Sequence, residues 1–330
     1  MTQTRIVFWG SPQIAATFLA HMVQNHADRF VVTACVTQTE KTIQRQGKTA
    51  ARSAVHEKAI ALGLPVFTPR SVKKEAELLL GELDAIGYDL FVVLAYGKIL
   101  PESIINAPRL KSVNFHGSLL PLLRGASPIE HAILHGFHET GWTLQRIVTA
   151  LDAGDIIAQS RVTIDNAETT GTLYAKMTEN LLQCGPAMLT AYVDGTAQII
   201  PQDHSAATHC GKISAEDGRI DFTRPAIEII NRYRAFTPRP GVFAFLRDRK
   251  IKLAFDLQAE PVPAGQPPGT LLVPAKGILL VCCGDGNALP LLALTPEGKK
   301  AMPVADFING YRIAGGADRL LDTASAPSHT

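Results

Sequence analysis

The amino-acid sequence predicts an α/β protein with two domains, a doubly wound, mostly parallel sheet followed by a small β-barrel. The length of 330 residues exceeds what a single hydrophobic core usually holds. In the first half, short β-branched segments alternate with longer helical patterns, which is typical of a parallel sheet. Beyond residue 199, short strand patterns separated by turn signals replace most of the helices, which favours an antiparallel barrel.

The first half contains the strands and helices of the parallel sheet. Residues 5–9 form a continuous apolar segment that we expect to be a buried strand. Gly10, Ser11 and Pro12 then turn the chain into an amphipathic helix that ends near Asn25. Further strands are predicted at residues 30–36, 65–67, 90–94, 112–115, 142–148 and 156–162, and further helices at 53–62, 72–83 and 170–192.

The second half contains the barrel and one helix. The helix is predicted at residues 225–236, and the strands at 241–246, 250–255, 269–272, 278–282 and 289–294. The last residues, from Asp318, are small and polar, and we expect them to form a flexible tail. The expected domains are therefore residues 1–206 and 207–317, with a tail at 318–330.

Composition excludes several classes of protein. Hydrophobic residues make up 46% and charged residues 19%, an ordinary globular balance that excludes wholesale disorder. No apolar run reaches the roughly 18 residues of a membrane span, and the first residues lack the apolar segment of a signal peptide. The five cysteines are scattered and include no CxxC pair. We expect a cytoplasmic protein without membrane association, and a monomer, since no long apolar stripe indicates a dimer.

The positive charge of the chain is concentrated in its second half. Residues 1–206 hold 17 Lys and Arg against 18 Asp and Glu, whereas residues 207–330 hold 15 against 12. Within residues 232–252 seven basic residues accompany only Asp248. Such a stretch indicates a surface that binds a polyanion, because Lys and Arg make most contacts to phosphates, although a solvated basic face remains the alternative.

The strongest local pattern is the segment from Asn114 to Pro121, at the carboxyl end of a predicted strand. Asn114 and His116 point to the same side of that strand, at the edge where open α/β sheets bind ligands. An amide beside an imidazole suits acyl transfer, since both can donate to an oxyanion and the imidazole can move a proton near neutral pH. The alternative is that Asn114 only caps the following turn.

Two carboxylates, Asp152 and Asp155, stand in a tight glycine turn before a strand. Either could orient the histidine or assist proton transfer, and local turn hydrogen bonds are the alternative role. The first strand–turn–helix carries Gly10 without a G-x-G-x-x-G pattern, so no nicotinamide or flavin is expected, and the chain has no P-loop and no G-x-S-x-G turn. No carboxylate or cysteine completes a ligand set around the histidines at 131, 135 and 138, so no metal is expected.

Together these motifs resemble the folate-dependent formyltransferases. The resemblance is carried by residues 113–121, 124–129 and 151–155. It extends along nearly the whole chain, through residues 95–101, 212–221, 234–236, 296–302 and 306–310, toward the members of the family that formylate methionyl-tRNA. The motif near residue 300 separates those members from the sugar-nucleotide formyltransferases.

The resemblance implies a fold, a pair of substrates and a set of site residues. The fold is a Rossmann-like catalytic domain followed by an OB-type barrel that helps to hold tRNA. The substrates are 10-formyltetrahydrofolate as donor and methionyl-initiator tRNA as acceptor. Asn114, His116 and Asp152 are then the catalytic residues, with Asp152 chosen over Asp155 by its spacing from Asn114. The residues expected to lie against the folate are Ser118, Leu119, Leu120 and Pro121.

The resemblance also implies that the loop at residues 38–52 reaches the acceptor stem of the tRNA. The candidate tRNA contacts are Lys41, Arg45, Lys48 and Arg52 in this loop, and Arg234 and Arg239 in the basic stretch. The loop lacks the Asp-Arg-Pro-x-Gly-Arg-Gly run usual in the family. Thr237 and Arg239 stand where the family usually has Asn and Trp, so the tRNA contacts should differ in detail.

Three other functions fit parts of the same pattern. A formyltransferase acting on an amino-sugar nucleotide would keep the same catalytic residues, but the basic second domain and the Lys299-Lys300 motif argue against it. A catalytically inactive tRNA-binding module would have no need of the Asn114, His116 and Asp152 set. A formyltransferase of purine synthesis would need no barrel.

Overall fold

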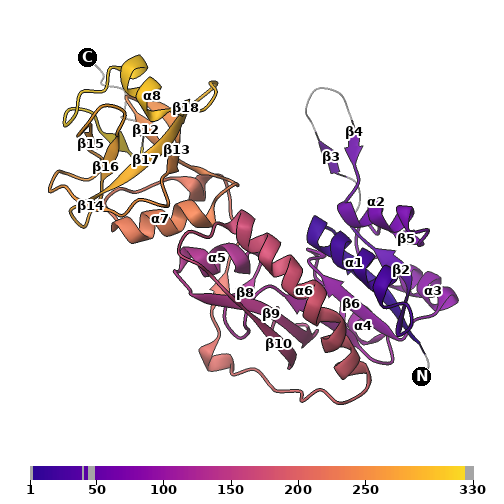
Figure 1. Ribbon diagram of the computed structural model, residues 1–330. Coiled ribbons are helices and arrows are strands. Elements are labelled where there is room, and N and C mark those ends of the chain that lie inside the picture. The colour runs from indigo at the N-terminus through magenta and orange to yellow at the C-terminus, as the bar shows by residue number, and fades with distance from the viewer. Residues whose placement is uncertain (1–2, 39–40, 44–48, 324–330) are drawn as a thin grey trace. The chain divides into compact units, whose positions relative to one another are not determined.

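The computed structural model describes residues 3–38, 41–43 and 49–323 (Figure 1). Within these residues the contacts define two compact units. The first contains the chain up to Pro128, Glu139–Val162 and Tyr174–Gly211, and the second contains Ile129–His138, Thr163–Leu173 and the chain from Lys212. Two short segments from the first half thus belong to the second unit, and the domain boundary after residue 206 stays a proposal.

The first unit is built on a seven-stranded sheet in the order β10-β9-β7-β6-β1-β2-β5. Neighbouring strands from β7 to β5 are parallel, and β9 runs antiparallel to β7. The strands are β1 (Thr4–Gly10), β2 (Phe30–Val36), β5 (Val66–Phe67), β6 (Leu90–Leu94), β7 (Ser112–His116), β9 (Glu139–Arg146) and β10 (Ile156–Thr163). The predicted doubly wound, mostly parallel sheet is confirmed.

Alternation of side chains along β1 explains why helices cover both faces of this sheet. Phe8 points to one face, where its ring lies 6.4 Å from that of Phe18 in α1. Trp9 points to the other face, where it packs with Phe91 and with residues of α3 and α4. The helices from the first half of the chain are α1 (Gln13–Asn25), α2 (Ala54–Ala61), α3 (Ala76–Ile86), α4 (Glu102–Asn106), α5 (Pro128–Leu134) and α6 (Thr170–Val193).

The second unit contains an antiparallel sheet in the order β15-β16-β17-β13-β12-β19. Its two edges meet, since the N–H of Leu271 donates to Asp318 O at 2.9 Å and the N–H of Leu320 donates to Gly269 O at 2.8 Å. The sheet is therefore closed into a small barrel, as the sequence predicts. The strands are β12 (Val242–Leu246), β13 (Arg249–Phe255), β14 (Val262–Pro263), β15 (Leu271–Leu272), β16 (Leu280–Cys282), β17 (Asn287–Pro296), β18 (Met302–Pro303) and β19 (Leu320–Leu321), with helices α7 (Ala226–Ala235) and α8 (Val304–Tyr311).

Residues 318–321 differ from the flexible tail that the sequence predicts. The side chain of Asp318 accepts hydrogen bonds from Arg247 Nη2 at 2.6 Å and from the backbone N–H of Ala314 at 3.1 Å. Leu320 is 1% exposed and belongs to β19, which pairs with β12. This part of the chain is ordered because it closes the barrel. The mostly small and polar residues of the segment did not indicate that role.

Short elements account for the other differences from the prediction. The loop at 38–52 contains a hairpin, β3 (Lys41–Ile43) and β4 (Thr49–Ala51). The pairing of β8 (Arg124–Gly125) with β11 (His209–Cys210) joins segments more than eighty residues apart and has no local signal. Among the helices that the structure describes, none is long and apolar enough to cross a membrane.

Candidate active site

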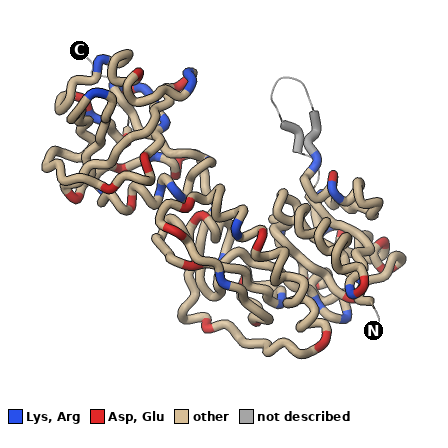
Figure 2. Tube along the Cα trace, viewed as in Figure 1, with Lys and Arg blue, Asp and Glu red and all other residues tan. Residues whose placement is uncertain are grey.

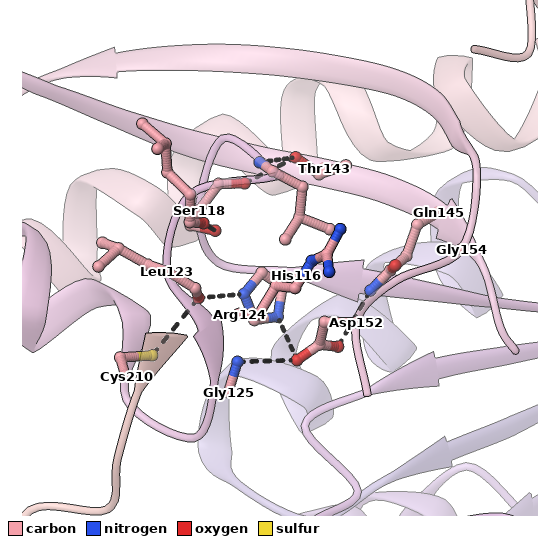
Figure 3. Close-up of polar contacts among 12 residues, drawn as sticks. His116, Ser118, Leu123, Arg124, Gly125, Thr143, Gln145, Asp152, Gly154 and Cys210 are labelled. Carbon is pink, nitrogen blue, oxygen red and sulfur yellow. Dashed lines mark hydrogen bonds and ion pairs between the residues drawn. The ribbon is translucent and has the colours of Figure 1, made fainter. Parts of the chain in front are cut away.

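His116, at the end of β7, and Asp152, in the loop between β9 and β10, form the centre of the candidate site (Figure 3). His116 Nδ1 lies 3.6 Å from Asp152 Oδ2. His116 Nε2 lies 2.9 Å from the carbonyl oxygen of Leu123, and because a carbonyl can only accept, Nε2 carries the proton of that hydrogen bond. The histidine is 6% exposed, so these contacts fix a ring that is largely shielded from water.

The carboxylate of Asp152 is held from two further sides. Oδ2 accepts a hydrogen bond from the backbone N–H of Gly125 at 2.9 Å. Oδ1 accepts one from Nε2 of Gln145 in β9 at 3.0 Å. With a donor on each oxygen, the carboxylate is oriented toward His116 before any substrate binds (Figure 3).

Asn114 lies two residues before His116 on β7 and thus on the same side of the strand. In the sheet it stands between Val93 of β6 and Gln145 of β9. The side chain is half-buried, and within the described part of the chain its amide makes no hydrogen bond. This amide is therefore available to a substrate.

Asp155 lies apart from the histidine and pairs with a surface arginine. Its Oδ2 lies 3.7 Å from Nη1 of Arg146, and both side chains are 42% exposed. Of the two carboxylates in the glycine turn, Asp152 is the one that contacts His116. The catalytic role of Asp152, which the resemblance implies, stays a proposal.

The segment expected to contact folate is fixed by buried hydrogen bonds. Ser118 is 1% exposed, and its hydroxyl donates to Leu122 O at 2.6 Å. Thr143 Oγ1 donates to Ser118 O and accepts from the N–H of Leu120, which is itself buried. Leu119 and Pro121 are half-buried and offer apolar surface. The four residues thus form a rigid wall, in which the hydroxyl of Ser118 is already used.

The candidate tRNA contacts comprise residues without a described side chain, two exposed arginines and the buried Arg234. Lys41, Arg45 and Lys48 lie outside the residues whose side chains are described. Arg52 and Arg239 are exposed. Figure 2 shows that basic residues are spread over several parts of the second unit, with acidic residues among them.

Arg234 has a different place from the one predicted. It is 6% exposed, and its guanidinium donates to Glu168 O at 2.9 Å, Asp165 O at 2.6 Å and Asn231 Oδ1 at 2.9 Å. Burial lowers the pKa of this guanidinium, and the Glu168 carboxylate opposes that shift. Arg234 therefore holds the second unit together, a correction to the tRNA contact expected from its position in the basic stretch.

The histidines of α5 and the turn after it form no described metal centre. The rings of His131 and His135 lie 5.9 Å apart. Burial, and then the positive charge of His131, lower the pKa of His135. Across residues 3–38, 41–43 and 49–323, no three His, Cys, Asp or Glu side chains gather in a way that could hold a metal ion.

Gln145, Gly125, Arg124 and Gln202 contribute to the site although the sequence gave no role to any of them. Gln145 and Gly125 contact the Asp152 carboxylate directly. Nε2 of Gln202 lies 2.9 Å from Asp152 O, and Arg124 donates to Gln202 Oε1. Arg124 and Gly125 belong to a motif that resembles the family, but only the register of β7 with β9 and the pairing of β8 with β11 bring these residues to Asp152.

The fold and the site define a group-transfer enzyme acting on an acyl carbon. A free amide donor, an imidazole and an oriented carboxylate meet at the carboxyl end of a central parallel strand, the edge where doubly wound sheets bind ligands. This set can stabilise a tetrahedral oxyanion and move a proton. Such chemistry needs no metal or redox group.

Comparison with known proteins gives the family. The profile of the formyl transferase family matches residues 4–188, and that of the formyl transferase C-terminal domain matches residues 212–312. The methionyl-tRNA formyltransferase of Myxococcus xanthus is 38% identical over 96% of this chain and 98% of its own length, and that of Koribacter versatilis is 40% identical over 96% and 98%. The chain belongs to the formyltransferase family.

Solved structures share the fold at lower sequence identity. WlaRD, a sugar 3N-formyltransferase crystallised with dTDP and 5-N-formyl-THF, has a TM-score of 0.61 and 19% identity, covering 91% of this chain and 100% of its own. HypX from Aquifex aeolicus in complex with tetrahydrofolic acid has a TM-score of 0.59 and 15% identity, covering 94% of this chain and 48% of its own. At these identities the similarity concerns the fold alone.

Proposed function

We propose that this protein transfers the formyl group of 10-formyltetrahydrofolate to the α-amino group of methionyl-tRNA, the reaction that prepares initiator tRNA for translation. The contact between His116 and Asp152 beside the free amide of Asn114 is the observation that carries the reaction. The acceptor is supported by methionyl-tRNA formyltransferases that are 38–40% identical over both units of the chain. The half-buried apolar surface of Leu119 and Pro121 suits the flat ring of a folate.

In the proposed reaction the methionine amine attacks the formyl carbon and forms a new C–N bond. The carbonyl oxygen becomes an oxyanion, which the Asn114 amide can stabilise because it has no other described partner. The tetrahedral intermediate then breaks the bond to N10 of the folate. The amine loses a proton and N10 gains one.

His116 and Asp152 serve this proton transfer. Both ring nitrogens of His116 contact protein oxygens, so the ring can act on substrate only by exchanging one contact. The contact of Nδ1 with Asp152, at 3.6 Å, is longer than the hydrogen bond of Nε2 at 2.9 Å and is the easier one to exchange. Asp152 stabilises the positive charge that develops on the ring as it takes the proton.

The experiment offers purified protein the formyl donor with charged methionyl initiator tRNA or, separately, with an amino-sugar nucleotide. Formylation of the tRNA and its loss in His116→Ala are the expected results. Asn114→Ala should lower kcat by about 10²–10³, as expected for one oxyanion donor. Transfer only to the sugar would replace the proposed acceptor, and an Asn114→Ala rate within about threefold of wild type would remove this residue from the mechanism.

The remaining parts of the proposal concern the partner surface and the location. We propose that Lys41, Arg45, Lys48, Arg52 and Arg239 contact tRNA, as the resemblance implies. We also propose a cytoplasmic location, where initiator tRNA is charged, and a monomeric state.

A further inference from the structure

A strap of the chain that follows α6 returns to the active site of the first unit. This strap, residues 202–210, carries Gln202 at one end and β11 at the other. β11 pairs with β8, so that Thr208 O accepts from the N–H of Arg124 at 2.9 Å. The strap therefore lies against the segment that surrounds both His116 and Asp152.

The strap contacts the hydrogen-bond acceptor of His116. The carbonyl oxygen of Leu123, which accepts from His116 Nε2, also accepts from Cys210 Sγ at 3.4 Å. The N–H of Leu123 donates to Thr208 Oγ1 at 2.8 Å. Leu123 has a φ of 58°, a left-handed backbone that such contacts help to maintain.

Gln202, which is 6% exposed, holds the loop of Asp152 from behind. Its Nε2 lies 2.9 Å from Asp152 O and 2.6 Å from Gly154 O. Asp152 itself has a φ of 49°, another left-handed position that a residue other than glycine adopts at some cost. Two hydrogen bonds to the loop carbonyls oppose relaxation of this backbone.

The direction of the hydrogen bonds around Gln202 is fixed by Arg124. This arginine is 6% exposed, and its Nε and Nη2 donate to Gln202 Oε1 at 3.1 and 2.7 Å. Because a guanidinium can only donate, the oxygen of the Gln202 amide must face Arg124 and its NH₂ must face the loop. The same NH₂ lies 3.4 Å from Gln145 Oε1. Gln145 therefore keeps its own NH₂ toward Asp152 Oδ1.

We propose that Gln202 is a positioning residue for the reaction, which sets the Asp152 carboxylate through the loop backbone and through the amide of Gln145. The proposal rests on the proposed function. Arg124 determines which end of the Gln202 amide faces the loop. The Asp152 carboxylate then accepts hydrogen bonds from the N–H of Gly125 and from the NH₂ of Gln145. A carboxylate displaced by about 1 Å would slow transfer on the order of 10²-fold.

Gln202→Glu tests the direction of the hydrogen bonds while keeping the shape of the side chain. Glutamate can still pair with Arg124, but it cannot donate to the carbonyls of Asp152 and Gly154. It also accepts from Gln145 and so turns the Gln145 oxygen toward the Asp152 carboxylate. Gln198→Glu, at an exposed residue of the same region, adds the same charge and is the matched control.

The variants are compared in formylation of methionyl-tRNA and in thermal unfolding. We expect Gln202→Glu to lower kcat roughly 10–100-fold while the KM values for both substrates stay within about threefold, and Gln198→Glu to match wild type. A general loss of structure would instead lower Tm and raise KM. If Gln202→Glu does not fold, Gln202→Met replaces it, since methionine has similar length and no donor.

The outcomes separate this proposal from the proposed function. An active wild type with a Gln202→Glu kcat within about threefold overturns the positioning role and leaves the function intact. An inactive wild type overturns the function, and a crystal structure of Gln202→Glu then decides about positioning. Displacement of the Asp152 carboxylate from Gly125 N supports the role, whereas an unchanged 2.9 Å contact overturns it.

Discussion

Gly154→Ala is expected to slow catalysis because the added methyl group would displace the loop that carries Asp152. A Cβ built on Gly154 would lie 1.8 Å from the backbone oxygen of Arg146 at the end of β9. Real Cβ atoms stay at least 3.0 Å from such an atom, so strand or loop must move apart by about 1.2 Å. The loop carries Asp152, and a movement of this size should lower kcat on the order of 10²-fold. The overpacking should cost about 1–3 kcal/mol of unfolding free energy.

The assay is formylation of methionyl-tRNA at saturating folate, with urea unfolding measured on the same samples. Gly211→Ala is the matched control, because a Cβ at that glycine meets no atom within 4 Å. The control should keep both the rate and the stability of wild type. A Gly154→Ala enzyme with kcat within about threefold of wild type would mean that the close approach of loop and strand does not set the position of Asp152.

Three further predictions concern the barrel, the pH dependence of stability and the tRNA. Deletion of residues 318–330 removes β19 and the acceptor of Arg247, and should lower the Tm of the barrel; unchanged unfolding and unchanged near-ultraviolet circular dichroism would refute its role in closure. Burial, and then the charge of His21, lower the pKa of His26, so the unfolded chain binds this proton more tightly. The resulting stability is fully present above about pH 6.5 and is lost as the pH falls below it, and His26→Gln should flatten that loss in urea titrations between about pH 7 and 5. Lys48→Ala should weaken tRNA binding and reduce its dependence on salt, and an unchanged salt slope would exclude a phosphate contact.

The helices and strands that could be predicted from the sequence are those with a local hydrophobic pattern. The predicted strand at residues 30–36 is β2, Phe30–Val36, and the predicted helix at 170–192 is α6, Thr170–Val193. Both segments are long enough for their hydrophobic pattern to be recognised from neighbouring residues alone. The strand β19 has only Leu320 and Leu321, and its stability comes from its partners across the barrel. No local pattern can report such partners.

The residues of the candidate site likewise include some that a local pattern predicts and others that it does not. Asn114 and His116 could be predicted together because a strand brings every second residue to one side. The glycine turn offered Asp152 and Asp155 as partners of the histidine, and the choice of Asp152 came from resemblance to a family. In the structure His116 Nδ1 lies 3.6 Å from Asp152 Oδ2.

Gln145 and Gln202 had no signal of either kind. Gln145 faces Asn114 only because of the register between β7 and β9. Gln202 is buried at Asp152 O only because the chain returns after a 24-residue helix to pair with β8. A glutamine in a polar connection predicts an exposed side chain, yet here burial requires that every donor and acceptor be matched, and Arg124 leaves one orientation that does so. The residues that the sequence does not reveal at this site are thus those that hold Asp152 in place, since their role depends on partners that the fold brings together from separate segments of the chain.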